Sequence, residues 1–429
     1  MKFKSHLPLF VALFISLPVL AQKTYIHAGQ IFDAAKGKMI KNKTLVIEGK
    51  KITNLLDGWV ASENPTDNTL DLKTKTVLPG LIDMHVHIES EYTPQAYMGK
   101  YKDDDADRAF DAAQNAQRTL MAGFTTVRDM GGTGVNIALR DAIAQGKVPG
   151  PRIFSAEKAI GTTGGHADPT NGSRKELMGD PGPRDGVINS PDEAREAVRH
   201  RYKNGADCIK ITATGGVTSV AKNGQNPQFT YEEIKAIVDT ATDYGMHVAA
   251  HAHGDEGMYR AVLAGVKTIE HGTLVSERTM ELMKEKQTYL VATISAGKHV
   301  AKMAKIKGFF PEIIVPKAIA IGPQIQATFG SAYKKGVPIA FGTDAGVFPH
   351  GENAQEFVYM VEAGMPEHEA LQHAMITNAK LLGVADELGQ LLPGYTADII
   401  AVGQNPLDDI TTLQNVSFVM KEGQVYKNN

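Results

Sequence analysis

Residues 77–87 read VLPGLIDMHVH, an apolar run that enters a Pro-Gly corner and ends on two histidines, His85 and His87. Side chains two residues apart in an extended strand point to the same side, so the two imidazoles project together. Neutral imidazoles at a strand end suit a borderline cation such as zinc. The chain has 14 histidines, so this pair alone is a weak sign and the rest of the chain has to decide.

The middle of the chain alternates between strand-like and helix-like segments. Helical patterns follow most of the apolar segments, and the pattern over 231–244 is preceded by Thr230, which forms a capping box with Glu233. Eight strands separated by helices predict an α/β fold in which a parallel sheet closes into a (β/α)8 TIM-like barrel. The eight segments are 77–87, 125–129, 152–155, 207–211, 246–251, 268–271, 289–293 and 338–344.

The two ends of the chain differ from the middle. Short β segments separated by Gly, Asn and Lys occur within 23–76. Similar short β segments occur in the last forty residues, at 396–402 and 416–420. We therefore expect a small β-sandwich assembled from both chain ends beside the barrel. The predicted division is a signal peptide over 1–21, a barrel over 79–387, and a sandwich built from 22–78 and 388–429.

The first 21 residues have the pattern of a processing signal. Lys2 and Lys4 precede an apolar run over 7–20, and Ala21 offers a small residue at a cleavage site. The run is short for a membrane span, so we expect an exported, soluble protein, periplasmic or secreted, without stable membrane insertion. An uncleaved membrane anchor is the alternative.

Composition narrows the class of protein further. The formal net charge is −3, and no basic surface pattern typical of nucleic-acid binding is present, so we expect no nucleic-acid partner. Export would permit disulfides, yet Cys208 is the only cysteine, and we interpret it as a small core residue. Stability must then come from the size of the core and from bound metal.

Potential metal ligands follow nearly every predicted strand. Active-site residues of such barrels lie at the C-terminal ends of the strands, and His and Asp fall there too often for chance. An ammonium group among ligands is repelled, so Lys210 fits if it is neutral or carries CO2 as a bridging carbamate; a rim lysine paired with a carboxylate is the alternative. The residues at these ends are His85, His87, Lys210, His251, His253, His271 and Asp344.

These motifs resemble the amidohydrolase superfamily over nearly the whole mature chain. The order His-x-His, Lys, His, His, Asp is similar to the binuclear subtype of that superfamily. The stretches that carry the resemblance are 79–87, 209–211, 251–254, 269–273 and 342–344, together with the two β-rich chain ends.

The resemblance implies a centre of two divalent metal ions, with zinc as the expected metal, bridged by N6-carboxylated Lys210. It also implies that a metal-bridged hydroxide attacks the amide carbonyl, while Asp344 accepts the proton from the water and passes it to the leaving amine. Asp344 as a purely structural ligand or as a helix cap is the alternative. The implied ligands are His85, His87 and Asp344 for the buried metal, and His251 and His271 for the more exposed one.

Three loops narrow the resemblance to one branch. Residues 161–166, 213–217 and 348–351 look like the branch described as imidazolonepropionase-like, which includes Xaa-Pro dipeptidases, enzymes that cleave N-acyl amino acids, and hydrolases of ochratoxin amides. The resemblance implies cleavage of dipeptides or N-acyl amino acids, of the Xaa-Pro or Xaa-hydrophobic type. An exported peptidase that releases amino acids fits the expected compartment.

Such substrates end in a free carboxylate, so the site should carry hydrogen-bond donors. Tyr231 is the first candidate, and His253 shares a strand face with His251 and could bond the scissile carbonyl or the carboxylate. His166 and His350 lie on glycine-flanked loops and are further candidates for substrate contact. Hydrogen bonds that only stabilise the loops are the alternative for these side chains.

Arg128 and Asp129 stand at the end of the second predicted strand. Their opposite charges could form a pair close to the site. We interpret them as a structural ion pair rather than as groups that touch substrate.

Other functions use the same ligands. A cyclic-amide hydrolase, like imidazolonepropionase, dihydroorotase or hydantoinase, needs the same metal centre, although the signal peptide argues against those cytoplasmic pathways. A lactonase or phosphotriesterase-like activity is a smaller option. A non-catalytic binding barrel should have lost a ligand, and none is missing. Barrels of this kind often associate, so a homo-oligomer could form, but no residue determines it.

Overall fold

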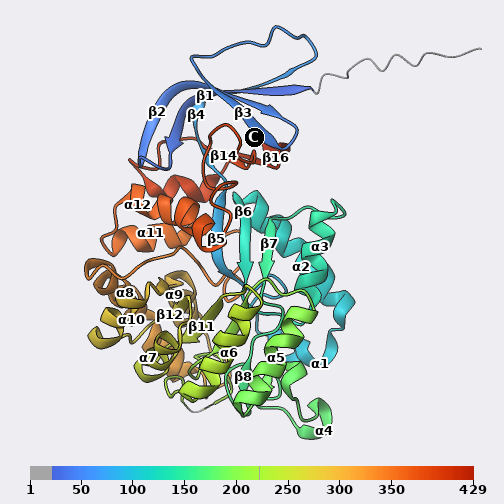
Figure 1. Ribbon diagram of the computed structural model, residues 1–429, viewed down its shortest axis with the longest axis vertical. Coiled ribbons are helices and arrows are strands. Elements are labelled where there is room, and N and C mark those ends of the chain that lie inside the picture. The colour runs from blue at the N-terminus through green and yellow to red at the C-terminus, as the bar shows by residue number, and fades with distance from the viewer. Residues whose placement is uncertain (1–21, 222) are drawn as a thin grey trace, which may run out of the picture.

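The computed structural model describes residues 22–221 and 223–429 (Figure 1). The predicted signal peptide, residues 1–21, lies outside the described residues. Within the described chain, no helix combines the length and the apolar character that crossing a membrane requires. The architecture is mixed α/β, with an antiparallel-rich sheet at one end of the long axis and helices around parallel strands at the other.

One seven-stranded sheet combines strands from both chain ends, in the order β16-β15-β14-β4-β1-β2-β3. β1 pairs antiparallel with β2 and parallel with β4, and β14 pairs antiparallel with β4, so the C-terminal strands lie directly beside the N-terminal ones (Figure 1). An apolar layer that includes Ile26, Leu45 and Phe418 covers it. The strands are β1 (Lys23–Asp33), β2 (Lys38–Glu48), β3 (Lys51–Asp57), β4 (Asn68–Pro79), β14 (Ile399–Val402), β15 (Phe418–Lys421) and β16 (Gln424–Asn428).

The strands of the middle region are parallel, as the alternation of strand and helix patterns predicts. They form two regular sheets, β5-β6-β7 and β10-β11-β12-β13, and a short β8-β9 pair lies apart. These strands are β5 (Leu81–Val86), β6 (Phe124–Asp129), β7 (Arg152–Ser155), β8 (Gly161–Thr162), β9 (Val187–Ile188), β10 (Ile209–Thr212), β11 (Val248–Ala252), β12 (Thr268–His271) and β13 (Tyr289–Val291).

Isolated parallel bridges link these sheets, and the predicted last strand, 338–344, is one of the linking segments rather than a regular strand. It bridges at Ile339 to Leu290, and Val86 bridges to Ala345 just after it. Side chains replace part of its backbone ladder, because Phe341 N donates to Asn378 and Thr343 N donates to Asp83. The segment still bonds through its backbone to β13 on one side, where Ala340 N donates to the Leu290 carbonyl, and to β5 on the other, where Met84 N donates to the Phe341 carbonyl.

Helices cover the parallel strands on the outside (Figure 1). The predicted capping box is confirmed at α6, where Thr230 Oγ1 accepts from Glu233 N and the Glu233 carboxylate accepts from Thr230 N. The helices are α1 (Ala96–Lys102), α2 (Asp105–Met121), α3 (Val135–Ala144), α4 (Lys175–Met178), α5 (Pro191–Lys203), α6 (Tyr231–Asp243), α7 (Asp255–Ala264), α8 (Glu277–Lys286), α9 (Ile294–Met303), α10 (Val315–Lys334), α11 (Gln355–Glu362), α12 (Glu367–Gln372) and α13 (Asn378–Leu381), with 3-10 turns at Pro183–Asp185 and Ile410–Asn415 and a π-helical turn at His373–Thr377.

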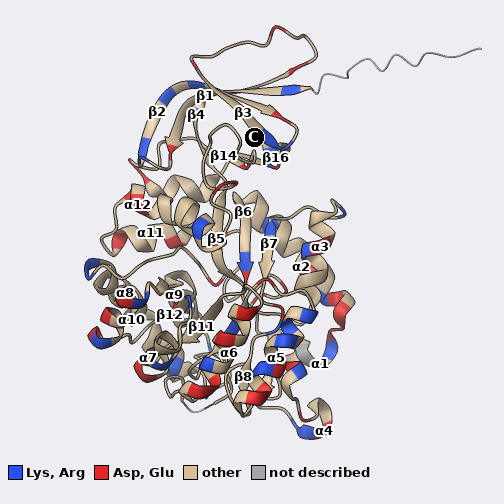
Figure 2. Cartoon of the chain, viewed as in Figure 1, with Lys and Arg blue, Asp and Glu red and all other residues tan. Residues whose placement is uncertain are grey.

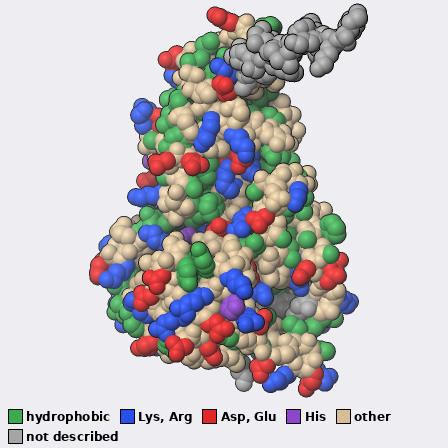
Figure 3. Space-filling view, turned by 45° about the vertical axis from the view of Figure 1, so that its right-hand side comes forward, with side chains coloured by type: hydrophobic (Ala, Val, Ile, Leu, Met, Phe, Trp, Pro, Cys, Tyr) green, Lys and Arg blue, Asp and Glu red, His purple; other side chains and the backbone are tan. Residues whose placement is uncertain are grey.

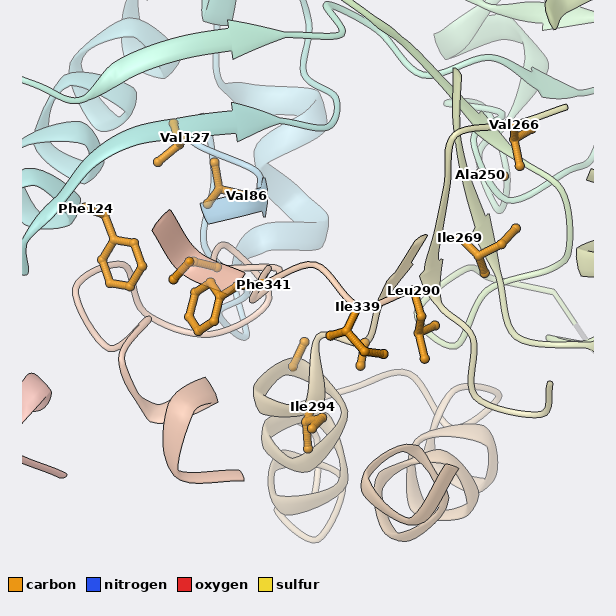
Figure 4. Packing of buried hydrophobic residues seen from close by; sticks show 14 of the residues in the cluster. Val86, Phe124, Val127, Ala250, Val266, Ile269, Leu290, Ile294, Ile339 and Phe341 are labelled. Atoms are coloured by element: carbon orange, nitrogen blue, oxygen red, sulfur yellow. The ribbon is translucent and has the colours of Figure 1, made fainter. Parts of the chain in front are cut away.

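The main core lies between the parallel strands and these helices. Figure 4 shows Phe124 and Phe341 beside Val86 at one side of it, and Ile269, Leu290 and Ile339 at the other. The Phe341 ring stacks on Phe124 with ring centroids 5.9 Å apart. Close packing of this kind fixes the strand ends that carry the polar residues.

Charged residues are concentrated on the outer helices and also occur in the strands, with both signs interspersed along the ribbon (Figure 2). The space-filling view shows the same mixture over the face that it presents, with no large area of a single sign (Figure 3). The buried charges are therefore the exception, and the most concentrated group of them lies at the ends of the parallel strands.

Candidate active site

The two histidines of the opening motif lie where the sequence predicts them. His85 is in β5 and His87 directly follows the strand, with ring centroids 5.4 Å apart. His85 is fully buried, and His87 faces a large cavity. His87 Nδ1 donates to the carbonyl of Gly131 over 2.8 Å, so its Nε2 keeps the lone pair.

Three neighbouring strands add three basic side chains. Lys210 comes from β10, His251 from β11 and His271 from the end of β12. The His271 ring lies 5.2 Å from the His85 ring and 4.7 Å from the His251 ring, measured between centroids. Lys210 Nζ lies 3.3 Å from His85 Nε2. The structure therefore brings together the residues that the sequence predicts as a cluster.

Asp344 completes this cluster from the segment after Phe341. Its Oδ1 lies 3.6 Å from Nε2 of His85 and 3.6 Å from Nε2 of His87, and has no hydrogen-bond partner although it is buried. The backbone of Asp344 is left-handed, with φ of 62°, and its N donates to the carbonyl of His85 over 2.7 Å. A strained, tethered backbone thus holds an unpartnered carboxylate oxygen in front of two imidazoles.

The donor set fits a divalent cation. Nitrogen and oxygen atoms of His85, His271 and Asp344 all lie within 4.8 Å of one another, with all three side chains buried. His271 Nδ1 donates to Thr293 Oγ1 over 2.7 Å, because the hydroxyl proton of that threonine goes to the carbonyl of Ala292. Imidazole Nε2 lone pairs that face a carboxylate oxygen repel it unless a cation lies between them.

Burial determines the charge states of these groups. It lowers the pKa of His85, His251 and His271 well below the ordinary value, and that of His87 to about 4, so the four imidazoles are neutral. Burial also lowers the pKa of the Lys210 amine, against the attraction of nearby carboxylates. A lower pKa raises the fraction of neutral amine, which is the form of lysine that reacts with CO2.

A cavity of about 1090 Å³ opens above the cluster. Its lining includes the cluster residues His87, Lys210, His251, His271 and Asp344. A volume of this size accommodates a small-molecule substrate rather than a folded protein segment.

Two of the predicted substrate contacts lie in this cavity. His253 lines it, and its Nδ1 is 2.9 Å from Thr273 Oγ1, which leaves Nε2 for another partner. His166 also lines it, with its ring centroid 4.4 Å from that of His251, and its buried Nδ1 has no hydrogen-bond partner.

The structure does not bring the other two predicted contacts into the cavity lining. Tyr231 is the first residue of α6 and packs against the main core. His350 is buried behind His87, with its Nε2 3.1 Å from the His87 carbonyl and 3.2 Å from that of Ser90. His350 thus contacts the backbone that carries a cluster residue.

The predicted pair of Arg128 with Asp129 is wrong. The Arg128 guanidinium, fully buried, lies 2.9 Å from Glu270 Oε1 and also donates to the carbonyl of Met84. Asp129 instead accepts from Asn136 Nδ2 over 2.7 Å. Successive residues of a strand point to opposite faces, so two neighbours in β6 reach different partners.

Sequence reasoning missed Glu270. Its Oε2 accepts from His85 Nδ1 over 2.7 Å, so a buried carboxylate stands behind a cluster imidazole. The signal was the position of Glu270 directly before His271. In a regular strand these two side chains would point to opposite sides, but His271 has a φ of 72°, which breaks the alternation.

Parallel strands that end on a buried cluster of imidazoles and a carboxylate, beneath a cavity, define a metal-dependent α/β enzyme. Comparisons with known proteins specify the family. The Amidohydrolase family matches residues 76–426. The ochratoxinase of Aspergillus niger is 33% identical over 431 residues, which cover 95% of this chain and 87% of that protein.

Solved structures of similar proteins support the same family. A Xaa-Pro dipeptidase with bound methionine in the active site is 53% identical, with a TM-score of 0.92, over 95% of this chain and 100% of that one. A prolidase complexed with N-methylphosphonate-L-proline is 30% identical, with a TM-score of 0.87 and the same coverage. The chain belongs to the amidohydrolase family, in the branch that contains Xaa-Pro dipeptidases and ochratoxinase. It is a hydrolase of amide or peptide C–N bonds.

Proposed function

We propose that this chain is an exported metal-dependent dipeptidase that also accepts N-acyl amino acids. The observation that carries the proposal is the unpartnered Asp344 Oδ1, 3.6 Å from the Nε2 atoms of both His85 and His87. The Xaa-Pro dipeptidase at 53% identity and the ochratoxinase at 33% identity support an amide of an amino acid as the substrate class.

We further propose zinc as the metal, two ions per chain, and N6-carboxylation of Lys210. His85, His87 and Asp344 would hold one ion, and His251 and His271 the other. When bound, the ions would supply Lewis-acid chemistry, which polarises the scissile carbonyl and lowers the pKa of water.

Residues of the chain would carry out the proton transfer and the binding of the substrate. Asp344 Oδ1 has no other hydrogen-bond partner, so it can take a proton from water and deliver it to the leaving amine nitrogen. His253 Nδ1 is occupied by Thr273, so Nε2 can donate to the scissile carbonyl or to the substrate carboxylate. His166 lies beside His251 at the same cavity and would orient the substrate.

The same proposal includes the architecture and the compartment. Parallel bridges from Ile160 to Ile211, from Leu290 to Ile339 and from Val86 to Ala345 support closure of the parallel strands into a (β/α)8 barrel over 79–387. The seven-stranded sheet would correspond to the sandwich of 22–78 and 388–429. Export would be followed by cleavage near Ala21, which N-terminal sequencing of protein from a periplasmic fraction tests.

The decisive experiment is an amino-acid release assay on zinc-loaded mature protein. The substrates are Xaa-Pro and Xaa-Phe dipeptides, N-acyl amino acids, hydantoins and lactones, with Asp344→Asn as the inactive control. Free amino acid from the wild type but not from the variant supports the proposal. Ring opening without amino-acid release overturns it in favour of the cyclic-amide alternative. Metal analysis should give about two ions per chain, and ¹³C NMR with labelled bicarbonate should detect the lysine carbamate.

A further inference from the structure

One wall of the active-site cavity is apolar, and it is formed by two helices that pack against each other. The helices α9 and α10 lie side by side (Figure 1). Residues at helical spacing on both helices line the cavity, together with one residue of the loop after β10. Their side chains carry no charge and no hydrogen-bonding group. They are Val217, Ala296, Gly297, Val300, Ile321 and Ile325.

This wall begins at the metal-binding cluster. Thr293, whose Oγ1 accepts from His271 Nδ1, is the residue directly before α9. Val300 follows seven residues later, which places it about 10 Å further along the helix at 1.5 Å per residue. A substrate whose scissile bond lies at the cluster therefore reaches the apolar wall with an adjacent side chain.

Charged side chains line other parts of the cavity. They include Lys158, Arg108, Asp180 and Asp185, and Lys158 Nζ lies 3.7 Å from Asp185. The cavity thus has one side that can solvate the charged groups of a substrate and another side that cannot. This asymmetry orients a small ligand that has both a charged backbone and an apolar side chain.

Two groups close to the apolar wall that could bind an anion, the Lys317 amine and the N-terminus of α9, have their partners within the protein. Lys317, on α10, donates to the carbonyls of Gly216, Ser219 and Ala221 over 3.2, 2.8 and 2.7 Å, and does not line the cavity. The N-terminus of α9 is capped by Glu356, which accepts from the amides of residues 294 and 295 over 2.7 Å each. Neither group is available to bind an acidic side chain of a substrate.

We propose that this wall is the side-chain pocket of the enzyme and that it binds an apolar amino-acid side chain of the size of leucine, methionine or phenylalanine. Ile321 is the specificity-determining residue that the test addresses, because it lines the wall from α10 and packs in one buried cluster with Val217 and Val300. The inference rests on the proposed dipeptidase function and adds which amino acids that function selects.

The test compares two series of dipeptides, Xaa-Pro with Xaa varied and Leu-Yaa with Yaa varied, over Leu, Met, Phe, Ser and Arg. In at least one of the two series, kcat/KM of the wild type should be about tenfold or more higher for Leu, Met and Phe at the varied position than for Ser and Arg. Ile321→Asp places a carboxylate on the wall and should lower the Leu-to-Arg ratio of kcat/KM in that series about 100-fold.

The matched control is Ile319→Asp, because Ile319 lies on the same helix, is 48% exposed and does not line the cavity. That variant should keep the wild-type ratio. If Ile321→Asp does not fold, Val300→Ala decides: a shorter wall residue should raise the Phe-to-Leu ratio.

Failure of the inference differs from failure of the function. Cleavage of both series without side-chain preference, or an unchanged ratio in the folded variant, overturns the pocket while the dipeptidase function stands. Release of no amino acid from any dipeptide or N-acyl amino acid overturns the function itself, and the pocket assignment with it.

Discussion

His85 Nδ1 donates to Glu270 Oε2 over 2.7 Å, and both side chains are fully buried. The other oxygen of Glu270 accepts from Arg128 over 2.9 Å, so a charged pair stands behind a cluster imidazole. A carboxylate behind a ligating histidine determines the tautomer and the orientation of the ring. Because Glu270 bonds to both His85 and Arg128, a change at Glu270 should alter both the stability of the core and the affinity for metal.

Glu270→Gln should weaken metal binding about 10- to 100-fold. The carboxylate accepts from both His85 and Arg128, whereas an amide has a single acceptor oxygen and must face one donor with its NH2 group. Breaking the buried pair should also lower the free energy of unfolding by about 3–5 kcal/mol. Competition with a chelating dye measures the first effect, and urea titration measures the second.

Glu157→Gln is the matched control for that variant. Glu157 forms a comparably buried pair with Arg201, with Nε and Oε2 2.9 Å apart, but does not contact His85. It should lose stability and keep the metal affinity of the wild type. If both variants bind metal equally well, Glu270 acts only as part of the core.

Gly216→Ala should reduce kcat/KM about 10- to 100-fold. A Cβ atom at this position would lie 2.2 Å from Cε1 of His166, so the imidazole has to leave its place beside His251. Steady-state kinetics on the best dipeptide measures the effect. Gly182→Ala is the control, because a Cβ there meets no atom within 4 Å, and it should behave as the wild type. Equal activity of the two variants would remove His166 from the set of substrate contacts.

Much of the candidate cluster could be predicted from the order of residues along the chain. His85 and His87 follow from the period of an extended strand, and Lys210, His251 and His271 follow from the rule that strand ends carry the active site. These are local patterns, and the structure places all five side chains around one point.

Features that depend on nonlocal packing could not be predicted. Glu270 pairs in register with His251 and faces the same side of the sheet, while the left-handed backbone at His271 turns that imidazole toward the same cluster. No sequence signal indicates a positive φ at a histidine. Tyr231 follows a predicted loop, but whether a helix start faces the cavity depends on how the helix packs, and here it faces the core. The segment 338–344 is strand-like in sequence, yet the side chains of Asp83 and Asn378 accept from two of its backbone N–H groups, which would otherwise bond to a neighbouring strand.

Arg152→Ala should lower the free energy of unfolding by about 1–3 kcal/mol. Arg152, on β7, donates to Asp398 over 2.9 Å and to Glu422 over 2.8 Å, so it joins a strand of the parallel region to the C-terminal segments. Without it, the buried carboxylate of Asp398 loses its ion-pair partner. Urea titration measures the loss.

An exposed pair provides the comparison for that variant. Arg195 lies 2.7 Å from Asp192 on the surface of α5, where solvent screens the interaction. Arg195→Ala should change the free energy of unfolding by less than about 1 kcal/mol. A loss as large as that of Arg152→Ala would show that the position of Arg152 between the chain ends is not what matters.

The pH dependence of stability should contain a contribution from Glu356, whose carboxylate is 1% exposed and accepts from the amides that start α9. Burial raises the pKa of Glu356 from 4.5 to about 7 in the folded protein. Between these values the folded state binds more protons than the unfolded state, so this group lowers the free energy of unfolding as pH rises. The full effect is on the order of 3 kcal/mol.

Glu356→Gln removes that titration while it keeps the size of the side chain. We expect the stability of the wild type, measured relative to the variant by urea titration, to fall between pH 4.5 and 7 and to be constant above pH 8. Glu232→Gln, at an exposed position in the first turn of α6, controls for the loss of one carboxylate and should show no such trend. A constant difference between wild type and Glu356→Gln across this range would mean that the two amide hydrogen bonds offset the burial and keep Glu356 ionised.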